Sequence, residues 1–364
     1  MSLGIYIHIP FCAKKCAYCD FLSFQADSDV KKAYVKALKK QIESSPEKAV
    51  DSVFIGGGTP SVLDGSDIVS VMDSVRKTFK IEPECEITIE INPATAAKQK
   101  LFQYKEAGIN RISMGVQSFS DSELEILGRL HNSAQAKESF YLLREAGFCN
   151  VNFDLMFAIP KQTKESFLKS LSEAVSLSPE HISAYSLIIE EGTPFFQMEK
   201  NGVISQADEE LYVDMFSAAV ELLQQNGYNR YEISNFSKPG FESKHNLKYW
   251  SGDEYLGFGL GASGFVSGAR YENTRDLKEY LAGKEPEKNV LEKDELITEY
   301  IITSLRKCEG ISLDKFKEKF GSDFLKLYDI QKYIDGGFMK NLDGYVFFTE
   351  EGIRVSNQIL CMFV

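Results

Sequence analysis

The stretch GIYIHIPFCAKKCAYCD, residues 4–20, decides the fold. Residues 4–10 form an apolar run typical of a strand buried on both faces, and the chain continues directly into Cys12, Cys16 and Cys19. Three thiolates in a C-x3-C-x2-C spacing, with no fourth nearby, leave one iron of a [4Fe-4S] cluster without a protein ligand. The spacing therefore predicts a cluster with one open position at the end of the first strand.

A structural zinc site is the alternative interpretation of this triad. Such sites close with four ligands, and neither His8 nor Asp20 gives the paired spacing that they favour. The total of seven cysteines is odd, and the other four are too scattered for a disulfide framework: Cys85, Cys149, Cys308 and Cys361. This cysteine usage favours a reducing compartment, and we expect a cytoplasmic protein.

Composition excludes several classes of function. The 364 residues include 53 acidic and 41 basic side chains. The resulting net charge of −12 argues against electrostatic binding of nucleic-acid phosphates over a broad surface. No apolar run approaches the roughly 20 residues of a membrane span, and the N-terminus does not resemble a signal peptide. We therefore expect neither a nucleic-acid partner nor an integral membrane segment.

From residue 4 to about 236, short β-branched runs alternate with amphipathic helical stretches. This alternation predicts a parallel sheet with right-handed crossovers. The predicted strands are 4–10, 52–56, 86–92, 111–116, 151–157 and 181–189, with a further extended run at 229–236. The predicted helices are 29–44, 67–79, 94–107, 134–146, 164–177 and 208–225. We expect an α/β fold, a partial (β/α)6 TIM-like barrel over residues 1–236, with its chemistry at the carboxyl ends of the strands.

The remainder divides into two parts. Residues 237–285 form a connecting segment rich in Gly and aromatic residues, and they include the sequence HNLKYW at 245–250. Residues 286–364 are predicted to form a smaller C-terminal winged-helix-like α+β domain. Its expected elements are helices 294–305, 313–320 and 324–335, a hairpin of 338–342 with 345–349, and a last helix. Winged helices often bind nucleic acid, but this one has no obvious basic recognition helix.

Polar residues and glycines gather where the predicted strands end. Isolated polar groups are costly to bury, so such a set predicts a ligand pocket. Three consecutive glycines also let backbone groups approach a ligand closely. The residues concerned are Gly56, Gly57, Gly58 and Thr59, Glu90 and Asn92, Gln117 and Ser118, Arg129, and Asp154.

The cysteine spacing, with Tyr18 inside it and the glycine run after the second strand, resembles the radical S-adenosylmethionine (SAM) superfamily. The runs YIHIPFC, FIGGGTPS, GVQSF, LGRLH and DLM narrow the resemblance to oxygen-independent coproporphyrinogen III oxidase and its relatives, and it covers essentially the whole chain. The resemblance implies that SAM caps the open iron. It also implies SAM contacts from Tyr6, Tyr18, Gly57, Gly58, Thr59, Glu90, Gln117, Arg129 and Asp154.

Within this branch, three features resemble the heme chaperone HemW family more than the oxidase. The oxidase has an additional cysteine where this chain has Phe21, and it begins with a longer segment ahead of the first strand. The sequence from His245 to Trp250 is similar to the HNxxYW heme-binding motif of HemW. This resemblance implies heme ligation by His245. It also implies three kinds of partner: heme or porphyrin, heme-acceptor proteins, and an electron donor such as flavodoxin or ferredoxin.

Two alternatives remain open from sequence. One is the oxidase itself, an oxidoreductase that decarboxylates the propionates of coproporphyrinogen III, and the other is a radical SAM enzyme that modifies nucleic acid. Two positions depart from the family pattern, because Ala158 replaces a usual Gly and Ser263 replaces a common His. The loss of that His weakens the expectation of heme binding relative to that of SAM binding, and we expect Ala158 to be tolerated.

Overall fold

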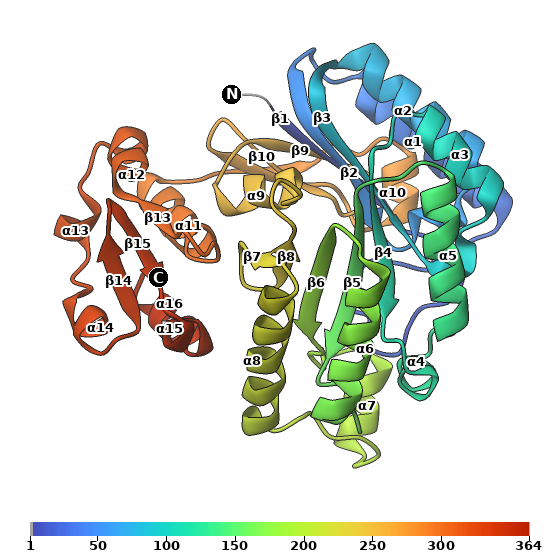
Figure 1. Ribbon diagram of the computed structural model, residues 1–364. Coiled ribbons are helices and arrows are strands. Elements are labelled where there is room, and N and C mark those ends of the chain that lie inside the picture. Colours follow the sequence, from blue (N-terminus) through green and yellow to red (C-terminus); the bar gives the residue numbers. More distant parts are fainter. Residues whose placement is uncertain (1–2, 364) are drawn as a thin grey trace.

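The computed structural model describes residues 3–363. Its larger unit is built on one curved sheet with the strand order β12-β11-β10-β9-β1-β2-β3-β4-β5-β6-β8-β7, and helices lie along the outer side (Figure 1). Strands β1 to β6 are consecutive parallel neighbours. They are β1 (Leu3–Ile9), β2 (Ala49–Gly57), β3 (Lys80–Ile91), β4 (Arg111–Gln117), β5 (Val151–Phe157) and β6 (His181–Ser186).

The strands are mostly buried along their length, as predicted for a parallel sheet covered on both faces. Side-chain caps start several covering helices, for example Asp27, Thr163 and Asp208. The helices are α1 (Ser28–Glu43), α2 (Gly65–Thr78), α3 (Lys98–Glu106), α4 (Asp121–Leu127), α5 (Ser133–Glu145), α6 (Lys164–Leu177), α7 (Pro194–Lys200) and α8 (Glu209–Gln225), with 3-10 turns η1 (Pro60–Val62) and η2 (Pro93–Thr95). This arrangement brings the carboxyl ends of six parallel strands to one edge of the sheet.

The predicted extended run at 229–236 is not one strand. It forms β7 (Asn229–Arg230) and β8 (Asn235–Ser237), which pair with each other in antiparallel fashion, and β8 is antiparallel to β6. A turn interrupts the run because the Tyr231 N–H donates to the Asn235 carbonyl at 3.2 Å, and the buried Glu232 carboxylate accepts the Ser234 N–H at 2.9 Å.

The segment predicted as a connection, 237–285, extends the sheet beyond β1. Strand β9 (Tyr255–Phe258) pairs in parallel with β1, and β10 (Ser263–Val266), β11 (Ala269–Glu272) and β12 (Glu287–Val290) follow as antiparallel strands. The expected boundary at 285 therefore falls inside the sheet, because β12 still pairs with β11. Two short helices belong to this region, α9 (Lys244–Trp250) and α10 (Leu277–Leu281).

The C-terminal unit packs helices on a three-stranded sheet of order β13-β15-β14. The predicted helix 324–335 is two short helices, because the Asp329 carboxylate accepts the Gln331 N–H at 3.1 Å and closes a turn between them. The elements are α11 (Lys293–Ser304), β13 (Ile311–Ser312), α12 (Leu313–Phe320), α13 (Phe324–Leu327), α14 (Gln331–Asp335), β14 (Met339–Leu342), β15 (Tyr345–Phe348), α15 (Glu350–Arg354), α16 (Ser356–Leu360) and η3 (Cys361–Phe363).

Helix length and polarity bear on the expected absence of a membrane segment. Over residues 3–363, none of the helices combines the length and the apolar character needed to cross a bilayer.

Candidate functional site

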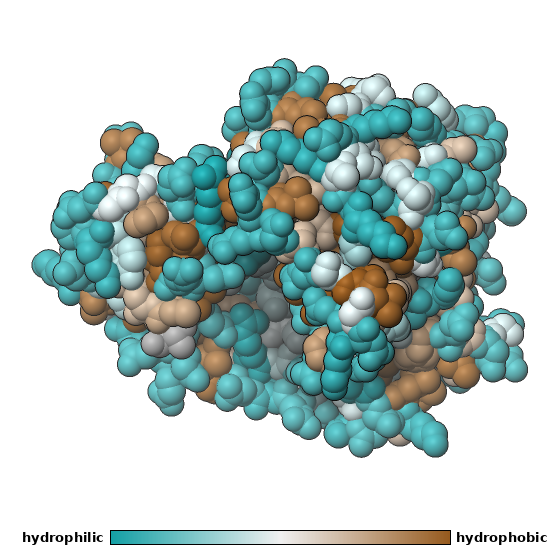
Figure 2. Space-filling view, turned by 90° about the horizontal axis from the view of Figure 1, so that it is seen from below, coloured by the Kyte–Doolittle hydropathy of each residue, from teal (hydrophilic) through white to brown (hydrophobic). Residues whose placement is uncertain are grey.

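A cavity of about 530 Å³ lies at the carboxyl ends of the barrel strands. Figure 2 looks at the molecule from the side where these strands end and shows a hollow in that face. All the residues predicted to hold the cluster or SAM line this cavity except Tyr6, and His245, predicted as a heme ligand, does not line it. The lining residues among them are Cys12, Cys16, Tyr18, Cys19, Gly57, Gly58, Thr59, Glu90, Gln117, Arg129 and Asp154.

The three cysteines lie in the loop between β1 and α1, and their thiols are free. The loop is closed at its base because the Cys12 N–H donates to the Phe24 carbonyl at 3.0 Å and the Phe24 N–H donates to the Pro10 carbonyl at 2.9 Å. Within the loop, the Cys19 N–H donates to the Cys16 carbonyl at 3.3 Å. These bonds hold the three thiols at the mouth of the cavity.

The glycine run after β2 fixes the other side of the cysteine loop. The Gly58 N–H donates to the Ile9 carbonyl at 2.9 Å, and the Thr59 hydroxyl lies 3.6 Å from the Cys12 sulfur. A Cβ on Gly58 would come within 2.7 Å of the Phe11 carbonyl and 3.1 Å of that sulfur. Only glycine permits this close approach, which leaves the first cysteine room for a cluster.

Arg129 and Gln117 occupy the floor near the second cysteine. The Arg129 guanidinium donates to the Cys16 sulfur at 3.6 Å and to the Gly115 carbonyl at 2.6 Å, while its buried Nε has no partner. Gln117 has a left-handed φ of 67°, which is rare for a residue with a side chain, and its amide oxygen accepts the Tyr185 hydroxyl at 2.7 Å. The cation with an unused donor fits a carboxylate group of a bound ligand, and backbone strain of this kind is typical of a binding site.

The carboxyl group of Glu90 lies beside the glycine run and accepts the Gly57 N–H at 3.1 Å. Burial and the nearby Asp154 raise the pKa of Glu90 to about 8. Burial likewise raises the pKa of Asp154, although Asn152 and Ser113 donate hydrogen bonds to its two oxygens. At neutral pH the Glu90 carboxyl group thus favours its neutral form, which can donate a hydrogen bond to a ligand oxygen.

We predict that Glu90→Gln stabilises the protein without cluster or SAM at pH 8 but not near pH 4.5. In the unfolded chain Glu90 ionises above its ordinary pKa of 4.5, whereas in the folded chain it stays protonated until about 8. The free energy of unfolding of the wild type therefore falls as the pH rises through that window. We expect a decrease on the order of 2 kcal/mol, which is less than the full pKa difference would give, because the group faces an open cavity. Urea unfolding at both pH values measures the difference. An exposed control, Glu84→Gln, should show no such pH dependence, and equal stability of Glu90→Gln and wild type at pH 8 would contradict the prediction.

The structure adds cavity residues that the sequence interpretation missed. They alternate along three strands, so that every second side chain of each strand faces the cavity: Arg111, Ser113 and Gly115 on β4, Asn152 and Met156 on β5, and Ser183 and Tyr185 on β6. The sequence pattern that could have identified most of them is a polar residue at every second position of an otherwise apolar strand.

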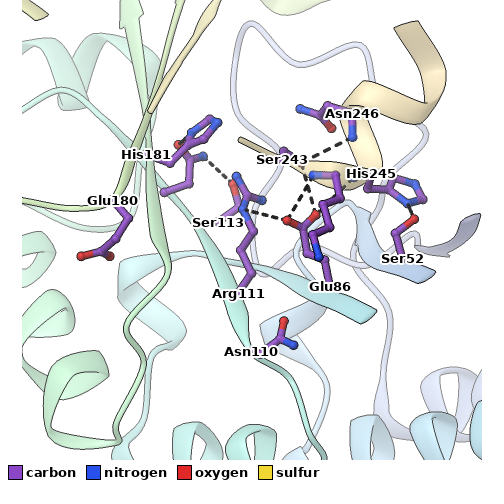
Figure 3. A network of polar contacts seen from close by, with 12 residues as sticks. Ser52, Glu86, Asn110, Arg111, Ser113, Glu180, His181, Ser243, His245 and Asn246 are labelled. Atoms are coloured by element: carbon purple, nitrogen blue, oxygen red, sulfur yellow. Dashed lines mark hydrogen bonds and ion pairs between the residues drawn. The ribbon is translucent and has the colours of Figure 1, made fainter. Parts of the chain in front are cut away.

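A buried polar network lies where the barrel meets α9 (Figure 3). The Glu86 carboxylate accepts the backbone N–H groups of Lys244 and His245, both at 3.2 Å, so it caps the first turn of α9. The Arg111 guanidinium lies 4.0 Å from the same carboxylate, and the two side chains are only 2% and 6% exposed. This ion pair connects the floor of the cavity to the HNLKYW sequence.

His245 lies outside the cavity, in the interior between α9 and β2. Its Nδ1 is hydrogen-bonded to the Ser52 hydroxyl at 3.0 Å (Figure 3). Its Nε2 is hydrogen-bonded to the Tyr249 hydroxyl at 2.9 Å. Its ring stacks on Phe54 at 5.4 Å, and burial lowers its pKa to about 3. Both ring nitrogens are occupied, so this conformation offers no nitrogen to a heme iron. The neighbouring Asn246 does line the cavity.

The structure also shows the environment of three other positions that the sequence analysis named: Tyr6, Ala158 and Ser263. Tyr6 lies beside the cavity, with its hydroxyl hydrogen-bonded to the His8 Nδ1 at 2.9 Å. Ala158 has a left-handed φ of 59°, which explains why glycine is usual there and adds strain of about 1 kcal/mol. Ser263 is exposed at the start of β10, and nothing in the structure explains the loss of the usual His.

The fold and the site define a radical SAM protein. The model of the Radical SAM superfamily matches residues 6–174, and the model of the HemN C-terminal domain matches residues 291–355. More particularly, the chain belongs to the heme chaperone HemW family. It is 37% identical to the heme chaperone HemW of Bacillus subtilis over 99% of this chain and 98% of that protein. It is 35% identical to the one from Lactococcus lactis over 99% of this chain and 96% of that protein.

A solved structure confirms the expected α/β barrel. The coproporphyrinogen III oxidase HemN of Escherichia coli superimposes with a TM-score of 0.85, covering 100% of this chain and 90% of that one at 24% sequence identity. At this identity the likeness establishes the fold alone. The full-length sequence relatives therefore decide the branch, as the sequence interpretation expected.

Proposed function

We propose that this protein is a heme chaperone that binds a [4Fe-4S] cluster, SAM and heme and passes the heme to acceptor proteins. The full-length similarity to heme chaperones is the observation that carries this proposal. Phe21 supports it. At this position the oxidase branch has an additional cysteine, whereas here a phenylalanine, 64% exposed, lies at the cavity mouth.

The residues of the cavity support defined roles in holding the cofactors. Cys12, Cys16 and Cys19 would hold three irons, and the fourth would take the amino and carboxylate groups of SAM. The Arg129 guanidinium suits the SAM carboxylate, since its buried Nε lacks a partner. The bound, reduced cluster supplies one electron that can cleave SAM. Carboxyl groups such as Glu90 and Asp154 suit the ribose hydroxyls.

The same cavity mouth supports an electron donor as a partner. Lys14 and Lys15 belong to the cysteine loop and line the cavity together with the exposed Ile188, so they form a basic and partly apolar rim beside the cluster ligands. An acidic redox protein of the flavodoxin or ferredoxin kind is complementary to this rim. Because the whole chain has a net charge of −12, this basic loop is the favoured approach for such a partner.

The test is an anaerobic reconstitution of the cluster, followed by titration with heme and, separately, by an assay with coproporphyrinogen III, reductant and SAM. We expect saturable heme binding with a Soret band, and transfer of that heme to an apo-acceptor protein. We expect no protoporphyrinogen IX. Failure of heme to bind to cluster-loaded protein would contradict the proposal, and sustained formation of protoporphyrinogen IX would favour the oxidase.

A further inference from the structure

A buried carboxyl group outside the cavity belongs to the short helix α4, which lies near the carboxyl ends of the barrel strands (Figure 1). The Glu123 side chain is only 4% exposed. Its Oε2 accepts the Ser118 hydroxyl at 2.6 Å and the Gln162 amide at 2.9 Å, and its Oε1 accepts the Ser166 hydroxyl. A buried carboxyl group is costly unless it is hydrogen-bonded, so these three donors make the arrangement stable.

The donors around Glu123 come from three separate segments of the barrel. Ser118 follows β4, Gln162 lies in the turn after β5, and Ser166 belongs to α6. Another residue of α6 strengthens the connection, because the Ser170 hydroxyl accepts the Phe119 N–H at 3.2 Å and lies 3.1 Å from the Ser118 hydroxyl. One carboxyl group thus ties the ends of two neighbouring strands to the helix that covers them. We call this set the Glu123 network: Glu123, Ser118, Gln162, Ser166 and Ser170.

Backbone strain is concentrated beside the Glu123 network. The Ser118 N–H donates to the Val116 carbonyl at 2.9 Å, so Gln117, with its φ of 67°, is the centre of a γ-turn of the rare, strained kind. In the turn after β5, Ala158 and Lys161 also have left-handed φ values, of 59° and 67°. Such conformations persist only where the surrounding structure holds them. The network supplies this hold on both turns.

We propose that Glu123 is a positioning residue of the SAM site, whose carboxyl group holds the γ-turn so that the Gln117 amide faces the cavity. This inference rests on the proposed function, in which the cavity holds SAM. Gln117 lines the cavity, whereas Glu123 does not, so Glu123 acts on the ligand through the turn. The turn sets the backbone of the residue that presents the amide, and the Tyr185 hydroxyl fixes the amide oxygen from the other side at 2.7 Å.

A purely structural role for the Glu123 network is the alternative, because the same hydrogen bonds also stabilise the fold. A loss of stability on substitution therefore does not distinguish the two roles. They differ once the Gln117 amide is absent. If Glu123 acts through this amide, its replacement has no further effect on SAM affinity in a Gln117→Ala background, whereas a purely structural loss lowers the affinity in both backgrounds.

The test measures SAM binding to cluster-loaded protein by equilibrium dialysis. We expect the dissociation constant to rise roughly tenfold in Glu123→Leu, which leaves Ser118 and Gln162 without their acceptor, while the iron content stays that of the wild type. Glu123→Gln keeps an acceptor oxygen for both and should restore most of the affinity. Glu123→Leu combined with Gln117→Ala should bind like Gln117→Ala alone. The exposed Glu125→Leu, on the same helix, is the matched control and should bind like the wild type.

Ser118→Ala breaks the same link from the side of the turn and removes only a hydroxyl, so it decides the matter even if Glu123→Leu fails to fold. We expect weaker SAM binding, and faster hydrogen exchange at the amide of residue 118 in the protein without SAM. Unchanged SAM affinity in these variants, or an equal loss with and without the Gln117 amide, would overturn the positioning role while leaving the SAM site intact. No SAM binding by cluster-loaded wild type would instead refute the proposed function on which the inference rests.

Discussion

Replacing Cys12, Cys16 or Cys19 with alanine is expected to abolish cluster assembly, with iron content after reconstitution falling from about four per chain to near zero. Each thiol lines the cavity, and the loop contains no fourth cysteine that could replace one of them. Iron and sulfide analysis with visible absorbance measures the loss. SAM binding should fall with it, because the open iron is the anchor of the amino and carboxylate groups.

Cys149→Ala is the matched control, since that thiol is exposed and lies outside the cavity. It should retain the full cluster. A variant of the triad that keeps its iron would show that another group completes the site, and loss of the cluster in Cys149→Ala would point to a general folding defect. Circular dichroism of each variant separates the two explanations.

The second large effect is expected at Glu86. Replacing it with leucine removes the acceptor of the Lys244 and His245 N–H groups and the ion-pair partner of the buried Arg111, which typically costs about 3–5 kcal/mol of unfolding free energy. Because Asn246 of α9 lines the cavity, we also expect SAM binding to weaken. Urea unfolding and ligand titration measure the two effects.

The double variant Glu86→Leu with Arg111→Met should recover much of this loss, because it removes the uncompensated charge as well. Glu84→Leu, on the same strand but exposed, is the control and should cost little. If Glu86→Leu unfolds within 1 kcal/mol of the wild type, the ion pair and the cap do not stabilise the junction between barrel and α9.

The placement of His245 changes how the HNLKYW sequence is interpreted. Read as sequence, His245 is the expected ligand, because its ring nitrogens are the chemically obvious heme donors. In the folded chain these nitrogens bond to Ser52 and Tyr249, which come from β2 and from the next turn of α9. The aromatic residues at the end of the motif, and not its histidine, lie at a cavity wall.

The features of this protein that the sequence by itself determined are local ones. The spacing of Cys12, Cys16 and Cys19 and the position of this triad directly after an apolar run predict a cluster at a strand end. The alternation of buried strands with capped helices predicts the parallel barrel. These features depend on periodicity and spacing within short stretches, so one chain suffices to detect them.

The tertiary structure decided which distant residues meet. The face of β4 that carries Arg111 is set by pairing with β3 and β5, and its partner Glu86 caps a helix that begins more than a hundred residues later. The addition of β9 beside β1 turns the expected connecting segment into part of the sheet. Residues of α9, the added strands and α11 meet around a second cavity of about 290 Å³. Such contacts depend on long-range pairing and burial, which the local pattern of a sequence does not encode.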